Sequence, residues 1–317
     1  MILAVVSKTA MLFLILIIGV IARLCGVIDA ASTKKLSALL VNVTQPLLII
    51  DSFQMPYSGE KVIFGLKVLL ASAILHCSVA LISYGVFKVE KRMEQKKVWE
   101  FALIFGNCAF LGYPVLEAVF ANPGGENPGI FYGAFYTLIF NVFIWTYGVA
   151  LLQRGRPDSR ESNNWRKIFL NIGVIACVIG FLFFLLKINL PPIIGDAVTM
   201  VGNMTFPLSM LIIGSLVATF DFKQIFKNGK LYYYTFMKLL AWPLLVTAIC
   251  SFLPFDSHLL LLCVVMASVP AASNCAIFAE LYDGDSILSA QCVGLTTLLS
   301  MGTIPLNLWI AQNIFGI

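Results

Sequence analysis

Long apolar stretches alternate with short polar segments along the whole chain. Each stretch has roughly the twenty residues that an α-helix needs to cross about 30 Å of hydrocarbon. They lie at residues 3–24, 36–53, 62–87, 98–120, 130–152, 168–186, 193–220, 231–252, 259–281 and 287–314. The pattern predicts an all-α polytopic membrane protein with ten transmembrane helices.

A polar segment divides these stretches into two groups of five. We predict a first five-helix repeat at residues 1–152, a short cytoplasmic linker at 153–165 and a second five-helix repeat at 166–317. Because five is odd, the second half begins on the opposite side of the membrane, so the repeats are inverted. Two recurring motifs support this division: Asn42-Val-Thr-Gln-Pro-Leu47 returns as Asn203-Met-Thr-Phe-Pro-Leu208, and Asn107-Cys-Ala109 returns as Asn274-Cys-Ala276.

Composition and charge agree with a membrane protein. The chain is 60% hydrophobic and 12% charged, whereas soluble domains have about 25% charged residues. Of its 21 basic residues, all but Lys8, Lys61, Lys67 and Lys187 fall on one side of the predicted topology. Basic residues are retained in the cytoplasm, so we expect a multi-pass protein of the inner or plasma membrane with both termini outside.

The same distribution accounts for the net charge of +5. The basic residues are spread over short loops rather than gathered on one helix, so we expect contact with lipid headgroups and none with nucleic acid. The eight cysteines form no C-x-x-C pair, and isolated cysteines in apolar helices usually behave as small hydrophobic residues. We expect no metal site and no cofactor.

The fourth and ninth stretches contain residues that interrupt a regular helix. Gly112 and Pro114 lie in the fourth stretch and Pro270 in the ninth. Proline removes a backbone donor and clashes with the carbonyl four residues earlier. Since backbone groups freed at this depth are tolerated only beside a cavity or inside protein, we expect both helices to be broken and to cross.

Such a crossing has the chemistry of an anion site. The N-termini of half-helices present unpaired amides with partial positive charge, and Asn107 and Asn274 add side-chain donors without a permanent charge. We predict a substrate site formed by Asn107, Asn274, Ser273 and Asn141. The alternative is structural, because transmembrane prolines often only kink a helix and a buried amide often links two helices.

Few ionisable residues lie within the stretches. His76, in the third, titrates near neutral pH in its unperturbed state, and Glu117 follows Pro114 closely. Both are candidates for coupling transport to an ion. Lys238, in the eighth stretch, is a further candidate. The alternatives are that Glu117 lies near the outer surface and that Lys238 extends its charge to the membrane interface.

The segment Asn107-Cys-Ala-Phe-Leu-Gly-Tyr-Pro114-Val-Leu116 resembles the fourth-helix signature of the auxin efflux carrier family. Residues 42–47 resemble that family's second helix, and residues 269–285 and 300–306 its ninth and tenth. The resemblance implies two inverted five-helix repeats with crossed helices 4 and 9. It also implies elevator-type alternating access, a scaffold of helices 1, 2, 6 and 7 that forms a homodimer, and a transport domain of helices 3–5 and 8–10.

Two differences separate this chain from the plant carriers of that family. Its linker is short, and Cys275 occupies a position where they have a second proline. The short form is similar to bacterial members, which are associated with malonate, malate and related anions. We therefore expect a secondary active transporter of small organic anions, either malonate- or malate-like dicarboxylates or auxin-like acids.

Three other functions are alternatives to this one. A sodium-coupled symporter of the bile-acid type is the main alternative, although cation sites need convergent carboxylates and carbonyls. An anion channel would show polar stripes lining a pore. An enzyme would need clustered acids, histidines or a nucleophile with its base, and with His76 and His258 as the only histidines we expect no enzymatic activity.

Overall fold

A computed structural model describes residues 2–88, 90–121, 127–154, 170–220, 228–281 and 284–316. Within these ranges the elements are helices, and there is no strand beyond one isolated bridge. Six continuous helical stretches are long and apolar enough to cross a membrane, at Ile2–Leu24, Gly59–Val86, Gly129–Gln153, Pro192–Val217, Gly229–Cys250 and Ser286–Phe315. The predicted all-helical class is confirmed.

The helices that the structure describes have the following bounds. In the first half they are α1 (Ile2–Leu24), α2 (Ala30–Leu39), α3 (Gln45–Ser52), α4 (Gly59–Val86), α5 (Met93–Ile104), α6 (Tyr113–Val119), α7 (Gly129–Phe143) and α8 (Val149–Gln153). In the second half they are α10 (Ile172–Leu186), α11 (Pro192–Asn203), α12 (Thr205–Val217), α14 (Gly229–Phe236), α15 (Trp242–Cys250), α16 (Ser257–Ser268), α17 (Asn274–Leu281) and α18 (Ser286–Phe315). Most of the predicted linker lies outside the described residues.

Three prolines within these stretches are accommodated by a local widening of the helix. A π-helical turn ends two residues before Pro46, Pro114 and Pro243, at Leu40–Thr44, Cys108–Gly112 and Met237–Ala241. A π-turn moves the preceding carbonyls away from the proline ring, which relieves the clash that proline makes in an α-helix. Each proline then lies in the first turn of the α-helical segment that follows.

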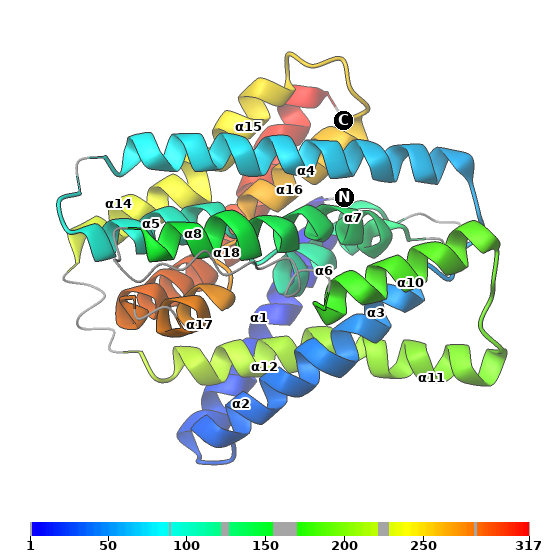
Figure 1. Cartoon of the computed structure of the whole chain (residues 1–317), viewed down its shortest axis with the longest axis horizontal. Coiled ribbons are helices and arrows are strands. Elements are labelled where there is room, and N and C mark those ends of the chain that lie inside the picture. The colour runs from blue at the N-terminus through cyan, green and yellow to red at the C-terminus, as the bar shows by residue number, and fades with distance from the viewer. Residues whose placement is uncertain are drawn as a thin grey trace.

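Two groups of helices pack side by side. In one group α3 lies against α10 and α11, and α12 lies against α1 and α2. In the other, α4 packs on α5, α7 and α16, while α18 packs on α16 and α17. Figure 1 shows α11 and α12 in the lower part of the molecule and α4 running across its upper part.

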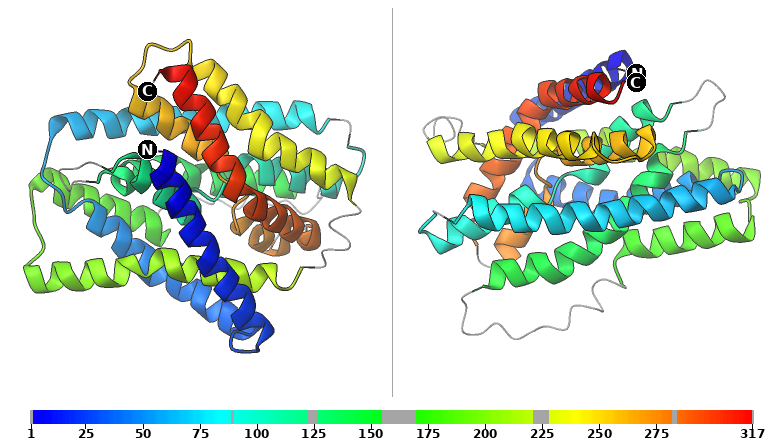
Figure 2. Two further views of the ribbon diagram at one scale, coloured as in Figure 1. Left: turned by 180° about the vertical axis from the view of Figure 1, so that it is seen from behind. Right: turned by 90° about the horizontal axis from the view of Figure 1, so that it is seen from above.

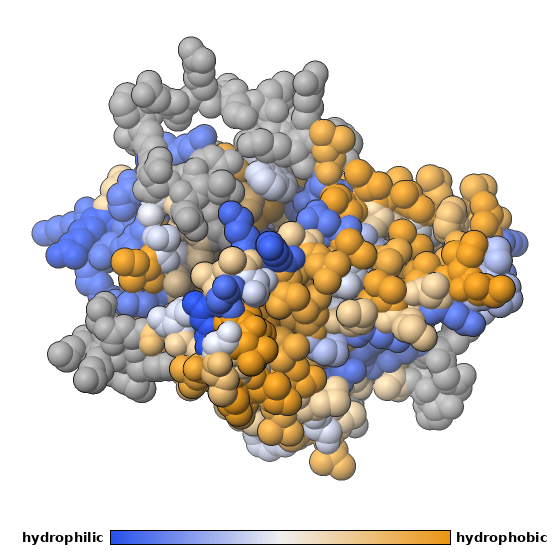
Figure 3. All heavy atoms as spheres, turned by 90° about the horizontal axis from the view of Figure 1, so that it is seen from below, coloured by the Kyte–Doolittle hydropathy of each residue, from blue (hydrophilic) through white to orange (hydrophobic). Residues whose placement is uncertain are grey.

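Much of the outer surface is apolar. The face in Figure 3 has a broad hydrophobic area, with hydrophilic residues gathered mainly at its left end. Helix α4 shows the pattern along its length, because its exposed side chains recur every three or four residues at Ile63, Leu66, Leu70 and Ile74. An exposed apolar stripe of this length fits contact with lipid rather than water.

The first group is held together by a close approach of α1 and α12, which cross in Figure 2. A Cβ added at Gly214 would lie 2.1 Å from the Leu16 carbonyl oxygen, and one at Gly19 would lie 2.4 Å from that of Leu211. Small residues at such contacts let helix backbones approach closely, which is how helices associate in lipid. A hydrogen bond of 2.9 Å between the hydroxyls of Thr33 and Ser215 joins the neighbouring α2 to the same helix.

Replacing Gly214 by valine is expected to separate α1 from α12, because the new side chain meets backbone rather than a movable side chain. Overpacking of this kind costs about 1–3 kcal/mol, so the melting temperature of the purified protein in detergent should fall by several degrees. Gly85→Val is the matched control, since nothing lies within 4 Å of a Cβ added at Gly85. Equal melting temperatures for the two variants would contradict this account of the contact.

Candidate functional site

The fourth apolar stretch is broken in the middle. Helix α5 ends at Ile104, the chain runs without helix through residues 105–107, and a π-turn that begins at Cys108 continues into α6. The Asn107 side chain caps this second half-helix, because its Oδ1 accepts a hydrogen bond of 3.2 Å from the amide of Phe110. Asparagine is among the residues that best satisfy free amides at a helix start.

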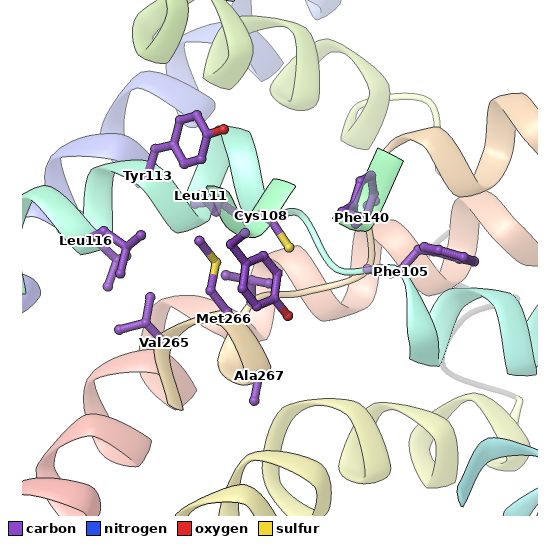
Figure 4. Close-up of a cluster of buried hydrophobic side chains, with 14 of the residues drawn as sticks. Phe105, Cys108, Leu111, Tyr113, Leu116, Phe140, Val265, Met266 and Ala267 are labelled. Atoms are coloured by element: carbon purple, nitrogen blue, oxygen red, sulfur yellow. The ribbon is translucent and has the colours of Figure 1, made fainter. Parts of the chain in front are cut away.

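The ninth stretch is broken in the same way, and the two breaks cross. Helix α16 ends at Ser268 and α17 begins at Asn274. The Asn107 amide donates to the Pro270 carbonyl at 2.7 Å, and the Ala272 amide donates to the Phe105 carbonyl at 2.9 Å. Figure 4 shows the two non-helical segments passing each other, with the Met266 and Cys108 side chains close by.

The position of the first break differs from the one expected. It lies at residues 105–107, whereas Gly112 and Pro114 are buried inside the following helix. Proline is tolerated in the first turn of an α-helix, and here the π-turn before Pro114 removes the clash. In the ninth stretch Pro270 does lie in the break, where its carbonyl accepts one of the crossing bonds.

A cavity of about 110 Å³ lies beside the crossing. All four predicted substrate-binding residues line it: Asn107, Asn141, Ser273 and Asn274. Its other lining residues include Gln45, Thr137 and Asn171, and every lining residue is uncharged. The first turns of both second half-helices therefore open into a polar, neutral cavity.

Two polar groups in this cavity have unused hydrogen-bonding capacity. The Asn107 Nδ2 and the Ser273 hydroxyl are buried and have no hydrogen-bond partner among the residues that the structure describes. A buried donor without a partner costs about 1–3 kcal/mol, and a ligand oxygen in the cavity would remove that cost. Asn141 differs, because its Nδ2 already uses one of its two N–H donors on the Thr137 carbonyl, at 2.8 Å.

Sequence analysis did not identify three polar residues that line the cavity, namely Gln45, Thr137 and Asn171. Gln45 belongs to the recurring motif at residues 42–47, but Asn42 of that motif is exposed and donates to the Ala38 carbonyl in its own helix. Asn171 caps the start of α10 through Val174. The motif was the available signal for Gln45, whereas a capping asparagine such as Asn171 looks the same in any helix.

The two candidates for coupling lie outside this cavity. His76 is buried on α4, where its Nδ1 lies 2.8 Å from the Ser72 carbonyl and its ring packs against Tyr136 and Phe143. Glu117 is partly exposed and forms a 3.0 Å ion pair with Lys8 of α1. The structure therefore does not bring His76 or Glu117 together with the four asparagine and serine residues.

Lys238 lies on the other side of the crossing. Its side chain is buried rather than extended to the interface, and its Nζ donates to the Leu103 carbonyl at 2.9 Å, near the end of α5. A second, much smaller cavity is lined by Lys238, His76 and Gly106, among others. A charged side chain inside a membrane protein is costly and by default marks a functional region.

Comparisons with known proteins agree with these features. A sequence model of a family described as membrane transport protein matches residues 4–310. A protein of Methanothermobacter thermautotrophicus described as an uncharacterized transporter is 26% identical over 95% of this chain and 96% of its own length. Another uncharacterized transporter, from Methanocaldococcus jannaschii, is 22% identical over the same shares. With its multiple apolar helices and the match over nearly its full length, the chain is a multi-pass membrane protein that belongs to the membrane transport protein family, the auxin efflux carriers.

Proposed function

We propose that this protein is a secondary active transporter of small organic anions. The substrates would be carboxylates, either malonate- or malate-like dicarboxylates or auxin-like acids, carried by elevator-type alternating access. The observation that carries the proposal is the neutral cavity into which two half-helices open, where the donor Nδ2 of Asn107 is buried and no described residue pairs with it. The family supports transport, and this cavity supports the choice of an anion.

Helix polarity favours an anion over a cation in the cavity. The start of a helix carries roughly half a positive charge, and its first amides have no partner inside the helix. Two such starts lie at Cys108 and Asn274, and none of the described residues lining the cavity has a carboxylate to attract a cation. Because the donors are neutral, the empty carrier returns across the membrane without exposing an uncompensated charge to lipid.

The location of the cavity suits an elevator mechanism. On one side it is lined by Gln45 of α3 and by Asn171 and Gly173 at the start of α10; on the other it is lined by the crossing segments and by Asn141 of α7. We assign the group of α1–α3 and α10–α12 as the scaffold and the remaining helices as the transport domain. A substrate held by the crossing would then move past the scaffold with the transport domain.

The proposed topology indicates which side of the membrane the site faces in this conformation. With ten transmembrane helices in inverted repeats and both termini outside, the start of α10 faces the cytoplasm. The cavity reaches that end of α10 through Asn171, so the conformation corresponds to a carrier whose site is oriented toward the cytoplasm of the inner or plasma membrane.

We further propose a homodimer formed through the scaffold. Exposed apolar side chains occur on α2 and α11, which belong to this group: Leu39, Ile193, Ile194 and Met200. A scaffold anchored by a second copy would stay in place while the transport domain moves.

The Asn107→Asp variant tests the anion site. Aspartate keeps an oxygen for the Phe110 amide, so the helix cap survives, but it replaces the unpaired Nδ2 with negative charge. Losing a hydrogen bond to a charged ligand costs about 1.5–3 kcal/mol, so the affinity for a carboxylate should fall by roughly tenfold or more. Uptake of radiolabelled malonate and malate into proteoliposomes measures it.

Asn42→Asp is the matched control for this variant, because Asn42 is exposed and does not line the cavity. Its uptake should equal that of the unmodified protein. The site assignment fails if Asn107→Asp transports as well as Asn42→Asp.

The ion pair between Lys8 and Glu117 joins α1 of the scaffold to α6 of the transport domain. We therefore expect it to stabilise the conformation in which these two helices are in contact. Partly exposed pairs contribute up to about 1 kcal/mol. Glu117→Lys should therefore change the uptake rate by roughly fivefold, and adding Lys8→Glu should restore it by reversing the pair. Failure of the double variant to recover would favour Glu117 as a coupling acid instead.

Proton coupling through His76 stays a prediction. If His76 carries the proton, His76→Gln should remove the dependence of uptake on a pH gradient, since glutamine cannot titrate. The measurement is uptake at several external pH values for both proteins in the same lipid. An unchanged pH profile would exclude His76 from coupling.

A further inference from the structure

Lys238 is a buried cation that the proposed anion site does not use. It lies in the π-helical turn Met237–Ala241 that joins α14 to α15, and its side chain is 2% exposed. Inside the described part of the chain no carboxylate forms an ion pair with it; its hydrogen bond is to the Leu103 carbonyl at 2.9 Å. A buried charge must be compensated by neighbouring groups, so the surroundings of Lys238 need to supply negative potential.

The crossing supplies that potential. A Cβ added at Gly106 would lie 3.3 Å from the Lys238 Nζ and 3.6 Å from the Pro270 carbonyl oxygen, so the ammonium lies directly beside the crossed segments. The first half-helices, α5 and α16, both end here, at Ile104 and Ser268. Each helix end carries about half a negative charge and free carbonyls, and the two together match one positive charge.

The π-turn that carries Lys238 is fixed against the crossing. The Asn307 Nδ2 donates to the Leu239 carbonyl at 2.8 Å and to the Ser268 hydroxyl at 3.2 Å. One side chain of α18 thus ties the turn to the last residue of α16. This arrangement holds the ammonium at one place relative to the two helix ends.

In transporters with discontinuous helices, the C-terminal ends and unwound carbonyls of the half-helices are the groups that hold a coupling sodium ion. Here an ammonium lies beside those ends. A lysine and a sodium ion carry the same charge, and both are attracted by carbonyl oxygens. The same negative potential cannot serve both at once.

We propose that Lys238 is a fixed counter-cation of the crossed helices that takes the place of a co-transported sodium ion, so that the carrier moves its anion without sodium. The expectation that transport is independent of sodium rests on the proposed anion transport. Whether sodium binds at the position of Lys238 can be measured without any substrate. The positive charge stays on the transport domain throughout the cycle. Two variants separate the charge of Lys238 from its volume.

Lys238→Ala removes the charge and leaves space beside the carbonyls, whereas Lys238→Met removes the charge and fills the space. Melting temperatures are compared in sodium chloride and in N-methyl-D-glucamine chloride at equal ionic strength. The unmodified protein should melt at the same temperature in both salts. Sodium should raise the melting temperature of Lys238→Ala by about 3 °C or more, because a bound ion stabilises the folded state, and should leave Lys238→Met unchanged.

Uptake of radiolabelled malonate into proteoliposomes measures the consequence for transport. The rate of the unmodified protein should be equal in the two salts. That of Lys238→Ala should fall about tenfold without sodium and recover with it, and that of Lys238→Met should stay low in both. Lys67→Met controls for the loss of a lysine, since Lys67 is exposed on α4 and its removal should change neither measurement.

Two results would overturn the proposal: stabilisation or faster uptake of the unmodified protein by sodium, or Lys238→Ala behaving like the unmodified protein in both salts. If a variant fails to fold, the response of the unmodified protein to sodium still tests the proposal. Absence of malonate uptake by the unmodified protein would count against the proposed substrate alone, because the melting comparison does not involve malonate.

Discussion

The central constraint on this protein is that backbone amides and carbonyls inside a bilayer need partners within the protein. Two helices stop halfway across the apolar region, and each leaves free groups that lipid cannot satisfy. The hydrogen bonds from Asn107 to Pro270 and from Ala272 to Phe105 pair one break with the other. Neither broken helix would be tolerated alone, so the two halves of the chain depend on each other at this point.

The crossing separates two kinds of helix end. The starts of the second half-helices open into the cavity lined by Asn107 and Asn274, and the ends of the first half-helices lie near Lys238. Because helix starts are electropositive and helix ends are electronegative, the crossing is polar although every residue lining the cavity is uncharged. The proposed anion on one side and the proposed fixed cation on the other both rest on this polarity.

Much of this arrangement was predictable from residue patterns, and the errors have clear causes. The apolar stretches predicted the helices, and the paired Asn107 and Asn274 motifs predicted the residues that meet at the cavity. The break was expected at Pro114 because proline disrupts an α-helix, but the π-turn before it absorbs the disruption. The hydrogen bond between Asn107 and Pro270 places the break at residues 105–107 instead. Because these residues are far apart in the chain, a local sequence pattern does not reveal the bond.

The sequence by itself determined the membrane environment, the helical class and the two motifs that contain Asn107 and Asn274, because these follow from hydropathy and from local patterns. Only the tertiary structure decided which polar residues share a cavity, that Glu117 pairs with Lys8, and that Lys238 points to the helix ends rather than to the membrane surface. Those outcomes depend on the relative rotation and depth of packed helices. Contacts between distant segments set both, and no local pattern encodes them.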